Sequence, residues 1–365
     1  MSDLNNARLK INAIDKEMAK LFEERMKVSK EVAEYKMEHG LPIFDRIREE
    51  EVIKRNIELI EDENLKKYYV MFLKDLMNTS KSYQQELISG LRVGYSGVEG
   101  AFGYIAAKKM FPNALLVSYP DFLSCYKACE NGECDIVVLP VENSYAGDVG
   151  AVMDLMFSGS LYINQMIDLD VVHNLIACKG ATKEGIKKVY SHAQALAQCA
   201  DYLRTLNVEE VEYPNTAMAA KMVSESNDLS IAAIASSETA ELYNLEVLEA
   251  NINASRNNTT RFAAFSRVQN LPNKTAKMGE HFILVFTVKN EAGSLANTLN
   301  IIGSHGFNMR ALRSRPMKEL MWNYYFYIEL DGNINTEDGK DMLRQVSTMC
   351  DRLKLVGTYT SIINK

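Results

Sequence analysis

The first 90 residues carry the helical repeat of apolar side chains and no pattern typical of a strand. The side chains of this repeat, separated mostly by three or four positions, are Leu4, Ala7, Ile11, Ile14, Met18, Leu21, Val28, Val32 and Tyr35. The repeat predicts one long amphipathic helix, which ends at the stop signals Gly40 and Pro42. Two more helices are predicted over about 45–64 and 65–88. Because such a long helix cannot bury its stripe against two shorter partners, we expect association with a second copy of the chain.

From Leu91 onward, short apolar runs alternate with helical segments. Strands are predicted at 91–93, 135–139, 189–191 and 230–235, and helices at 104–111, 150–157, 193–206, 216–224 and 237–243. This alternation predicts an α/β architecture with largely parallel sheets. The segment is long enough for two small lobes with a cleft between them, and clefts at domain junctions and at strand carboxyl ends are favoured ligand sites.

The last 85 or so residues predict the order βαββαβ of a ferredoxin-like α+β fold. The expected elements are strands at 282–288, 309–316, 322–330 and 353–363, with helices at 294–305 and 336–350. A short linker, 271–277, precedes them. The sequence therefore predicts three domains: an all-helical domain over 1–90, a two-lobed α/β domain over 91–270 and an α+β domain over 278–365.

Composition excludes several classes of function. The net charge of -7 and the lack of a basic run argue against nucleic acid as a partner. No apolar run approaches the roughly 18 residues that a membrane span needs. The start of the chain lacks the pattern of a signal peptide, and the six cysteines form no CxxC pair, so we expect reduced thiols and a cytoplasmic location. No cluster of metal ligands and no nucleotide motif is present, so no cofactor is implied.

Several polar side chains interrupt the apolar faces of the helical region. Arg25 lies in the stripe of the first helix, and Lys36 follows three turns later on nearly the same face. In the third helix, Ser80 and Gln84 are one turn apart among apolar residues. Each alone is typical of a surface ion pair or an extended stem. Together they predict a polar pocket in a helical bundle, since a buried cation needs a carboxylate or an anionic ligand.

This region resembles the all-helical chorismate mutases. The resemblance is carried by Ala7-Arg8, Glu24-Arg25-Met26, Lys36, the run from Pro42 to Glu49, and Ser80 with Gln84. In that family, an intertwined dimer supplies one arginine from the partner helix. The resemblance implies that Arg8 (from the other subunit), Arg25 and Arg48 hold the carboxylates of chorismate. It also implies that Lys36 and Gln84 face the ether oxygen, that Asp45 and Glu49 hold the ring hydroxyl, and that Ser80 belongs to the same site.

The rearrangement of chorismate to prephenate agrees with this set of residues. The reaction is pericyclic and needs no nucleophile or general base. An enzyme must fold the substrate into its reactive conformer and stabilise the negative charge that grows on the ether oxygen, and fixed cations and hydrogen-bond donors do both.

The stretch from Asn251 to Arg267 contains no Asp or Glu, although the chain as a whole is acidic. It combines arginines with the hydroxyls of Thr259 and Thr260 and leads into the apolar run from Phe262 to Phe265. This composition suits a small anionic ligand. It also suits a polar loop that leads into a buried strand.

Three other segments carry polar groups where a ligand could bind. The glycines from Gly94 to Gly103 match neither a P-loop nor GxGxxG. The segment from Pro140 to Asn143 follows a predicted buried strand. Ser191 to Gln194 precedes a helix and is equally suited to be a capping box, and Gln198 lies one turn after Gln194.

In this order, the four segments are similar to prephenate dehydratase, a family with two lobes like those of a periplasmic binding protein. The positions that match its motifs are Asn143, Ser191, Gln198, Thr260, Arg261 and Phe262. The resemblance implies that Thr260 protonates or hydrogen-bonds the departing ring hydroxyl, that Ser191 and Gln198 position the substrate, and that Arg261 binds a carboxylate. Ala101, Gly103 and Ala193 depart from the family pattern.

The C-terminal region resembles the ACT regulatory domain of these enzymes. Its two effector motifs match Gly293, Ser294 and Leu295, and Arg313, Ser314, Arg315 and Pro316. The resemblance implies feedback binding of phenylalanine at a subunit interface, with Arg313 replacing the usual acid. The same residues could also be only a helix start and a plain strand.

The sequence therefore predicts a homo-oligomeric enzyme of phenylalanine biosynthesis with mutase and dehydratase activities. Two alternatives remain open. The dehydratase could prefer arogenate, which differs from prephenate by an amino group in place of the keto group. The chain could also be a sensor of aromatic amino acids without catalysis.

Overall fold

A computed structural model describes residues 2–39, 46–254, 258–269, 280–317 and 323–360. The chain forms two compact units, of which the first comprises residues 1–92 with 113–115 and the second the remainder. The linker predicted at 271–277 and Asp45 lie outside the described residues. None of the described helices is long and apolar enough to cross a membrane.

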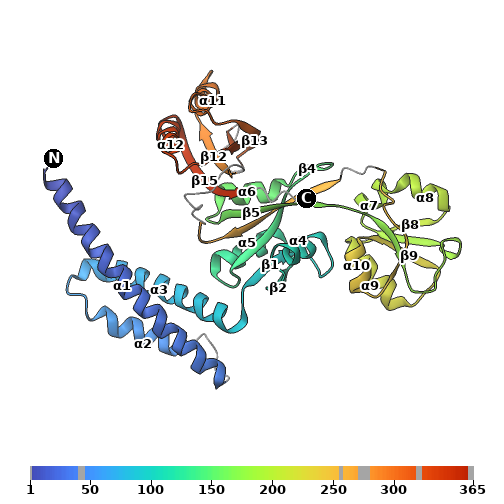
Figure 1. Cartoon of the computed structure of the whole chain (residues 1–365), viewed down its shortest axis with the longest axis horizontal. Helices are drawn as coiled ribbons and strands as arrows, with labels where there is room; N and C mark the ends of the chain where they lie inside the picture. Colours follow the sequence, from blue (N-terminus) through green and yellow to red (C-terminus); the bar gives the residue numbers. More distant parts are fainter. Residues whose placement is uncertain (1, 40–45, 255–257, 270–279, 318–322, 361–365) are drawn as a thin grey trace. The chain divides into compact units, whose positions relative to one another are not determined.

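Three helices form the first unit: α1 (Ser2–Glu38), α2 (Arg46–Ile57) and α3 (Glu63–Ser89) (Figure 1). The first and third agree with the apolar periodicity. The second ends earlier than predicted, because Leu59 and Ile60 turn back to hydrogen-bond the carbonyls of Asn56 and Ile57. Asp62 then caps α3 by accepting a hydrogen bond from the Asn64 amide.

Most of the apolar stripe of α1 is exposed in one copy of the chain. Only Ala33 of this helix is a buried apolar residue, together with Leu73 and Met77 of α3. More than half of the surface is exposed at Leu4, Leu9, Ile11, Ile14, Leu21 and Val28. Such a run of exposed apolar side chains marks an interaction surface rather than an ordinary solvent face.

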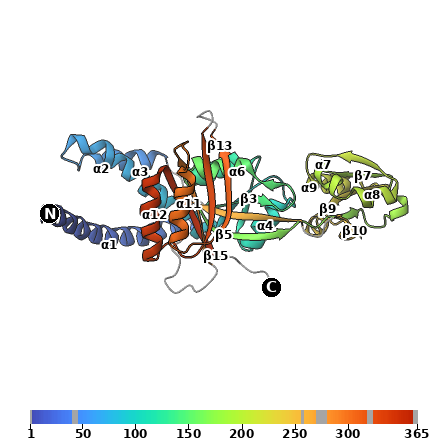
Figure 2. The same ribbon diagram turned by 90° about the horizontal axis from the view of Figure 1, so that it is seen from above.

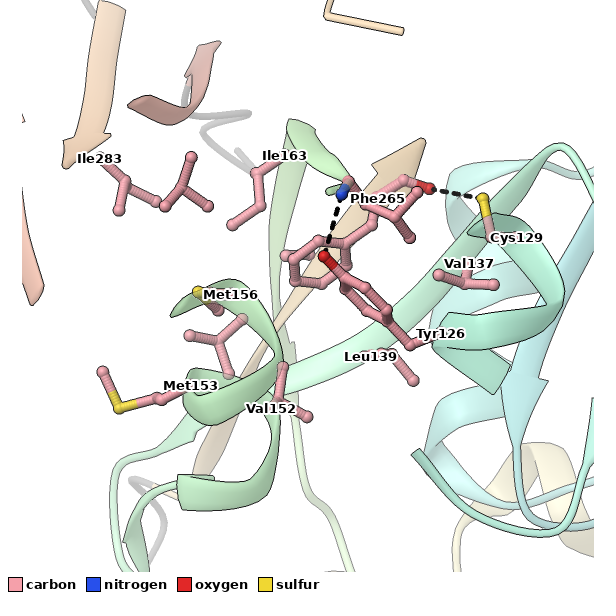
Figure 3. Packing of buried hydrophobic residues seen from close by; sticks show 14 of the residues in the cluster. Tyr126, Cys129, Val137, Leu139, Val152, Met153, Met156, Ile163, Phe265 and Ile283 are labelled. Atoms are coloured by element: carbon pink, nitrogen blue, oxygen red, sulfur yellow. Dashed lines mark hydrogen bonds between the residues drawn. The ribbon is translucent and has the colours of Figure 1, made fainter. Parts of the chain in front are cut away.

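The first lobe of the second unit contains the strands of one half of a large sheet. Its strands are β2 (Leu115–Tyr119), β1 (Arg92–Ser96), β3 (Ile136–Asn143), β11 (Thr259–Ser266) and β5 (Tyr162–Asp170), in that spatial order, with the short β4 (Gly147–Asp148) beside β3. The helices α4 (Phe102–Met110), α5 (Phe122–Asn131) and α6 (Gly150–Ser158) belong to this lobe. Tyr126, Leu139, Met153 and Phe265 meet in its core (Figure 3).

The second lobe has its own sheet, in the order β10 (Glu246–Glu249), β6 (Asn174–Ala177), β9 (Ile231–Ala235), β7 (Lys188–Ser191) and β8 (Glu209–Glu212). The 3-10 turn η1 (Lys183–Gly185) precedes β7. Its helices are α7 (Ala193–Gln198), α8 (Ala200–Leu206), α9 (Thr216–Ser226) and α10 (Ser237–Leu242). Two connections join the lobes, from β5 to β6 and from β10 back to β11.

Both sheets are mixed, so the prediction of largely parallel sheets was wrong. The return from the second lobe inserts β11 antiparallel between β3 and β5, and β6 pairs antiparallel with β9 and β10. Other corrections are local. Strands β2, β5, β6, β8 and β10 and helix α5 were missed, and the predicted helix 193–206 is interrupted at Cys199.

The C-terminal segment confirms the predicted order βαββαβ. It comprises β12 (Glu280–Val288), α11 (Ser294–Ser304), β13 (Met309–Pro316), β14 (Tyr324–Asp331), α12 (Glu337–Met349) and β15 (Cys350–Thr360). Helices α11 and α12 lie side by side on one face of its strands (Figure 2). On the other face, Ile283, Tyr325 and Tyr359 join the core of the first lobe.

Strand β15 continues the large sheet into the first lobe. Gly357 pairs in parallel with Ile163 of β5, and a Cβ atom at this position would overlap the backbone of Ile163. A glycine is therefore required where the two parts of the sheet meet.

Candidate active sites and regulatory residues

A cleft of about 470 Å³ lies between the two lobes. The first lobe contributes Phe102, Asn143 and Thr260, and the second contributes His192, Gln194, Gln198 and Thr216, among other residues. His173 and Asn258, on the two connections, also line it. The volume suits a small organic ligand. The described residues of the lining include no lysine or arginine.

Asn143 and Thr260 are brought together by strand pairing. Asn143 is the last residue of β3, which is longer than predicted, and its register partner in β11 is Thr260. The Asn143 amide donates from Nδ2 to Thr260 Oγ1 over 2.8 Å. Thr260 is about 9% exposed, and no described residue accepts its hydroxyl proton. The proton can therefore be donated to a ligand in the cleft.

Arg261, the next residue of β11, faces away from the cleft. Successive side chains of a strand point to opposite faces of the sheet, so the side chains of Thr260 and Arg261 lie on different faces. Arg261 Nε donates to Asp168 over 3.0 Å, and its Nη1 lies 3.5 Å from Glu329 Oε2. Burial alone would lower the pKa of Arg261, but Asp168 and Glu329 raise it above its usual value. The structure does not bring Arg261 to the cleft.

Two other residues of the predicted set also lie outside the lining. Ser191 is fully buried and donates to the Ile234 carbonyl over 2.8 Å, which ties β7 to β9. Phe262 packs in the core and is about 2% exposed. The N-cap of α7 is His192 rather than Ser191, because the His192 ring accepts from the Gln194 amide.

Sequence reasoning missed two residues of the cleft, His173 and Asn258, which are about 3% and 5% exposed. His173 Nε2 lies 2.9 Å from Gln198 Oε1, and Asn258 Nδ2 donates to the same oxygen over 3.0 Å. Burial lowers the pKa of His173, and the hydrogen bond to Gln198 opposes this. A histidine within the apolar run from Val171 to Ala177 was the available signal.

In the helical unit, the structure brings Arg25 and Ser80 into direct contact. Arg25 donates to Ser80 Oγ, and burial lowers the pKa of Arg25. Gln84 follows one turn later and is about 8% exposed, with its Oε1 buried and without a partner among the described residues.

The remaining mutase candidates are spread over α1 and α2. Lys36 is half-buried, whereas Arg8 is exposed. Glu49 pairs with Lys81 over 2.8 Å, and Arg48 lies 3.3 Å from Glu51.

The two expected effector motifs lie at the same end of the C-terminal sheet, where β12 and β13 both finish. Gly293, with φ of 87°, precedes Ser294 and Leu295 at the start of α11, just after β12. Arg313, Ser314, Arg315 and Pro316 end β13, and the pairing of both strands with β14 places these ends together. Because Gly293 adopts a left-handed conformation, a side chain there would strain the turn.

Both arginines of the second motif reach into the first lobe. Arg313 pairs with Glu142 and Asp148, and Arg315 Nε donates to Asp154 over 3.0 Å. Burial would lower the pKa of Arg313, but Glu142 and Asp148 raise it. Glu142 is the strand neighbour of Asn143, so the C-terminal domain contacts the strand that carries a cleft residue.

Two family models match the chain. The family model for chorismate mutase type II matches residues 7–85, and the one for prephenate dehydratase matches residues 93–270. A bifunctional chorismate mutase/prephenate dehydratase of Neisseria gonorrhoeae is 31% identical over 360 residues, covering 97% of this chain and 96% of its own length. That of Aquifex aeolicus is 29% identical over 366 residues, covering 98% of each.

Solved structures also match the chain. A prephenate dehydratase from Arthrobacter aurescens, in complex with L-Phe, has a TM-score of 0.67 and 25% identity, covering 74% of this chain and 90% of its own. The quorum-quenching acylase GqqA has a TM-score of 0.69 and 27% identity, covering 74% of this chain and 98% of its own.

A helical unit followed by a two-lobed α/β domain with a polar cleft and a βαββαβ segment defines a mutase joined to a dehydratase of aromatic amino-acid biosynthesis. The two activities are the conversion of chorismate to prephenate and of prephenate to phenylpyruvate. The chain belongs to the family of bifunctional chorismate mutase/prephenate dehydratases, which act in phenylalanine biosynthesis.

Proposed function

We propose that prephenate binds in the cleft between the lobes with its ring hydroxyl against Thr260. The observation that carries this proposal is the hydrogen bond from Asn143 Nδ2 to Thr260 Oγ1, which leaves the threonine proton for the cleft. The C–O bond of the ring breaks, and the carboxylate on the ring leaves as carbon dioxide, whose bonding electrons complete the aromatic ring. The hydroxyl departs as water after gaining one proton. Thr260 is a weak acid, so it orients and hydrogen-bonds this group while the net proton comes from solvent.

Neutral donors would then meet the carboxylates of prephenate, since the described lining holds no lysine or arginine. Gln198 supplies an amide in the cleft. Arg261 acts indirectly and does not contact prephenate. Its ion pairs with Asp168 and Glu329 hold the strand that carries Thr260. Ser191 and Phe262 act similarly, by fixing β7 and β11 from within the core.

The test compares two adjacent threonines. Thr260→Ala should lower phenylpyruvate formation by about 100-fold or more, by the scale of losing one positioned transition-state donor. Thr259→Ala is the matched control, because the Thr259 hydroxyl donates to Asp170 over 2.9 Å and Thr259 does not line the cleft. The mutase rate should survive in both variants. Wild-type dehydratase rates in Thr260→Ala would remove this residue from the mechanism.

For the mutase, we propose an active site built from Arg25, Lys36, Arg48, Asp45, Glu49, Ser80 and Gln84, completed by Arg8 of a second copy. The contact between Arg25 and Ser80 supports a polar pocket beside α3, as does the buried Gln84 Oε1, which has no partner in the described part of the chain. Lys36→Ala should lower the mutase rate by orders of magnitude, whereas the exposed Lys30→Ala on the same helix should not. Equal rates for the two variants would contradict the assignment.

The exposed stripe of α1 supports a homodimer formed through this helix. Leu21 is about 63% exposed in a single copy, and a charge there would be buried in such a dimer. Leu21→Glu should dissociate the dimer in analytical ultracentrifugation and abolish mutase activity. Leu229→Glu, at an exposed leucine of the second unit, is the control. A dimeric, fully active Leu21→Glu variant would rule out this interface.

We propose that phenylalanine is the effector and that it binds at the end of the C-terminal sheet where β12 and β13 finish, near Gly293 and Arg313. The fold of this segment and the adjacency of the two motifs support a site there. The contacts of Arg313 with Glu142 and Asp148 offer a route to the dehydratase lobe. A phenylalanine titration should lower the dehydratase rate and raise the midpoint of thermal unfolding. No change in either quantity would reject this part of the proposal.

Prephenate is the proposed substrate rather than arogenate. Arogenate carries an ammonium group, which a free carboxylate would bind. Asp148, the carboxylate in the described lining, is already paired with Arg313. Direct competition between the two substrates, read as the ratio of kcat/KM values, tests this preference.

We also propose domain boundaries near residue 90 and within 271–277, and a cytoplasmic location. The lack of a CxxC pair among the six cysteines of the sequence supports that location.

A further inference from the structure

Hydrogen bonds link Asn143, Thr260, Asn258, Gln198 and His173 along the cleft. Two backbone amides determine which atom donates in each of them. Tyr145 N–H and Ala146 N–H both donate to Asn143 Oδ1, over 2.9 and 2.7 Å. A backbone amide can only donate, so the Asn143 oxygen must point at the turn and its nitrogen at the cleft. Asn143 Nδ2 then donates to Thr260 Oγ1 and, over 2.9 Å, to Asn258 Oδ1.

The orientation of Asn143 also determines the orientations of the Asn258 and Gln198 amides. Because Asn258 Oδ1 is the acceptor for Asn143, Asn258 Nδ2 is the donor, and it reaches Gln198 Oε1 over 3.0 Å. His173 Nε2 lies 2.9 Å from that oxygen and must also donate to it. His173 therefore carries its proton on Nε2. Its Nδ1 is buried and has no partner among the described residues, so no acceptor there favours the other neutral tautomer, in which Nδ1 carries the proton.

This arrangement determines which end of the Gln198 amide is available to a ligand. With Oε1 occupied by two donors, the Nε2 amino group is left with no partner among the described residues. A carboxamide has nearly the same shape after a half-turn, so only its partners decide between the two orientations. The flipped form would present a carbonyl oxygen to a dianionic substrate and would lose both hydrogen bonds.

We propose that His173 is a positioning residue of the dehydratase: by donating from Nε2 to Gln198 Oε1, it holds the Gln198 amino group toward the cleft, where that group binds an oxygen of the substrate. This proposal rests on the proposed function of the cleft. It assigns to His173 no contact with the reacting bonds. The His173 ring also makes an edge contact with Phe102, at a centroid separation of 6.1 Å.

Substitutions at His173 separate the donor from the bulk of the ring. His173→Phe keeps a ring against Phe102 but removes the donor. His173→Gln places an amide N–H near the former Nε2. His173→Asn places one near the former Nδ1, so Gln198 Oε1 loses this donor and keeps only the one from Asn258 among the described residues. The asparagine and glutamine variants are matched in chemistry, so they keep the test informative even if His173→Phe folds poorly.

The experiment measures kcat and KM for prephenate in these variants, in Gln198→Ala and in the double variant His173→Phe/Gln198→Ala. We expect His173→Phe and His173→Asn to lower kcat/KM by about 10- to 100-fold, the effect of losing one buried hydrogen bond. His173→Gln should stay within about fivefold of wild type. The double variant should match Gln198→Ala within about threefold, because a residue that acts only through Gln198 has no effect once the amide is gone.

Two results would overturn the proposal. One is equal activity of the His173→Asn and His173→Gln variants. The other is a loss in His173→Phe that persists in full on the Gln198→Ala background, because His173 would then act independently. Mutase rate and the midpoint of thermal unfolding report folding in each variant. The comparison of Thr260→Ala with Thr259→Ala tests the proposed function by itself, since it changes neither His173 nor Gln198.

Discussion

Glu329 is a buried carboxylate that joins the C-terminal domain to the strand of Thr260. It lies in β14 and is about 2% exposed. Its Oε1 is 3.2 Å from Arg310 Nε and accepts from the Tyr359 hydroxyl, and its Oε2 is 3.5 Å from Arg261 Nη1. Glu329→Gln keeps the size and some hydrogen bonds but leaves the two arginines without this charge.

The expected cost follows from the surroundings of each arginine. Removing one partner of a buried ion pair costs about 3–5 kcal/mol. Here Arg261 keeps Asp168 at 3.0 Å, and the Arg310 side chain is 38% exposed and can turn to solvent. We therefore expect a smaller loss, about 2–3 kcal/mol, in the free energy of unfolding of the second unit. For a unit of this size, that loss lowers the midpoint by about 4–12 °C.

Thermal unfolding of the full chain, followed by calorimetry, measures this effect. Glu337→Gln is the matched control, because the Glu337 side chain is 91% exposed and pairs with Lys340 in the same helix. The control should change the midpoint by about 1 °C or less. If Glu329→Gln shifts the midpoint no further than the control, the buried carboxylate does not stabilise the contact, and the reasoning fails.

Three further predictions concern the same junction. Arg313→Glu would face Glu142 and Asp148 with a like charge, so it should reduce the response of dehydratase rate to phenylalanine while leaving the mutase unchanged. Gly357→Ala would overlap the backbone of Ile163, so it should cost several kcal/mol, about 3 or more, and raise the rate of limited proteolysis. Burial, with Arg352 nearby, lowers the pKa of Lys354 from its usual 10.5 to about 8. Because the unfolded chain then binds more protons between about pH 8 and 10, the Lys354 contribution should make stability rise with pH in that window. In Lys354→Met this contribution should disappear from the pH dependence of the unfolding midpoint, and an identical pH profile in both proteins would contradict it.

Local patterns were sufficient for much of the architecture. Neighbouring residues were enough to predict α1, α3 and the order of elements after residue 280, because a helix or strand shows its period over a short window. The absence of acids around Thr260 is likewise a local property, and it marks this segment as a candidate anion site by composition alone. The elements that were missed, such as β6 and β8, are short runs that lack a period long enough to be distinguished.

The direction of strands and the contents of the cleft depended on distant parts of the chain. Sequence reasoning expected parallel sheets because strands and helices alternate, but the chain leaves the first lobe and returns with β11 running the opposite way. His173 and Asn258 entered the site only because the two connections between lobes pass beside each other.

By itself, the sequence carries motifs that resemble those of a mutase and of a dehydratase, and the resemblance implied that Thr260 and Arg261 belong to one motif of the dehydratase. Only the tertiary structure decided that these neighbours serve different parts of the molecule. The alternation of a strand separates their side chains, but it does not say which face is the cleft. The pairing of β11 with β3 and the approach of β14 decide that, because they place Asn143 beside Thr260 and Glu329 beside Arg261.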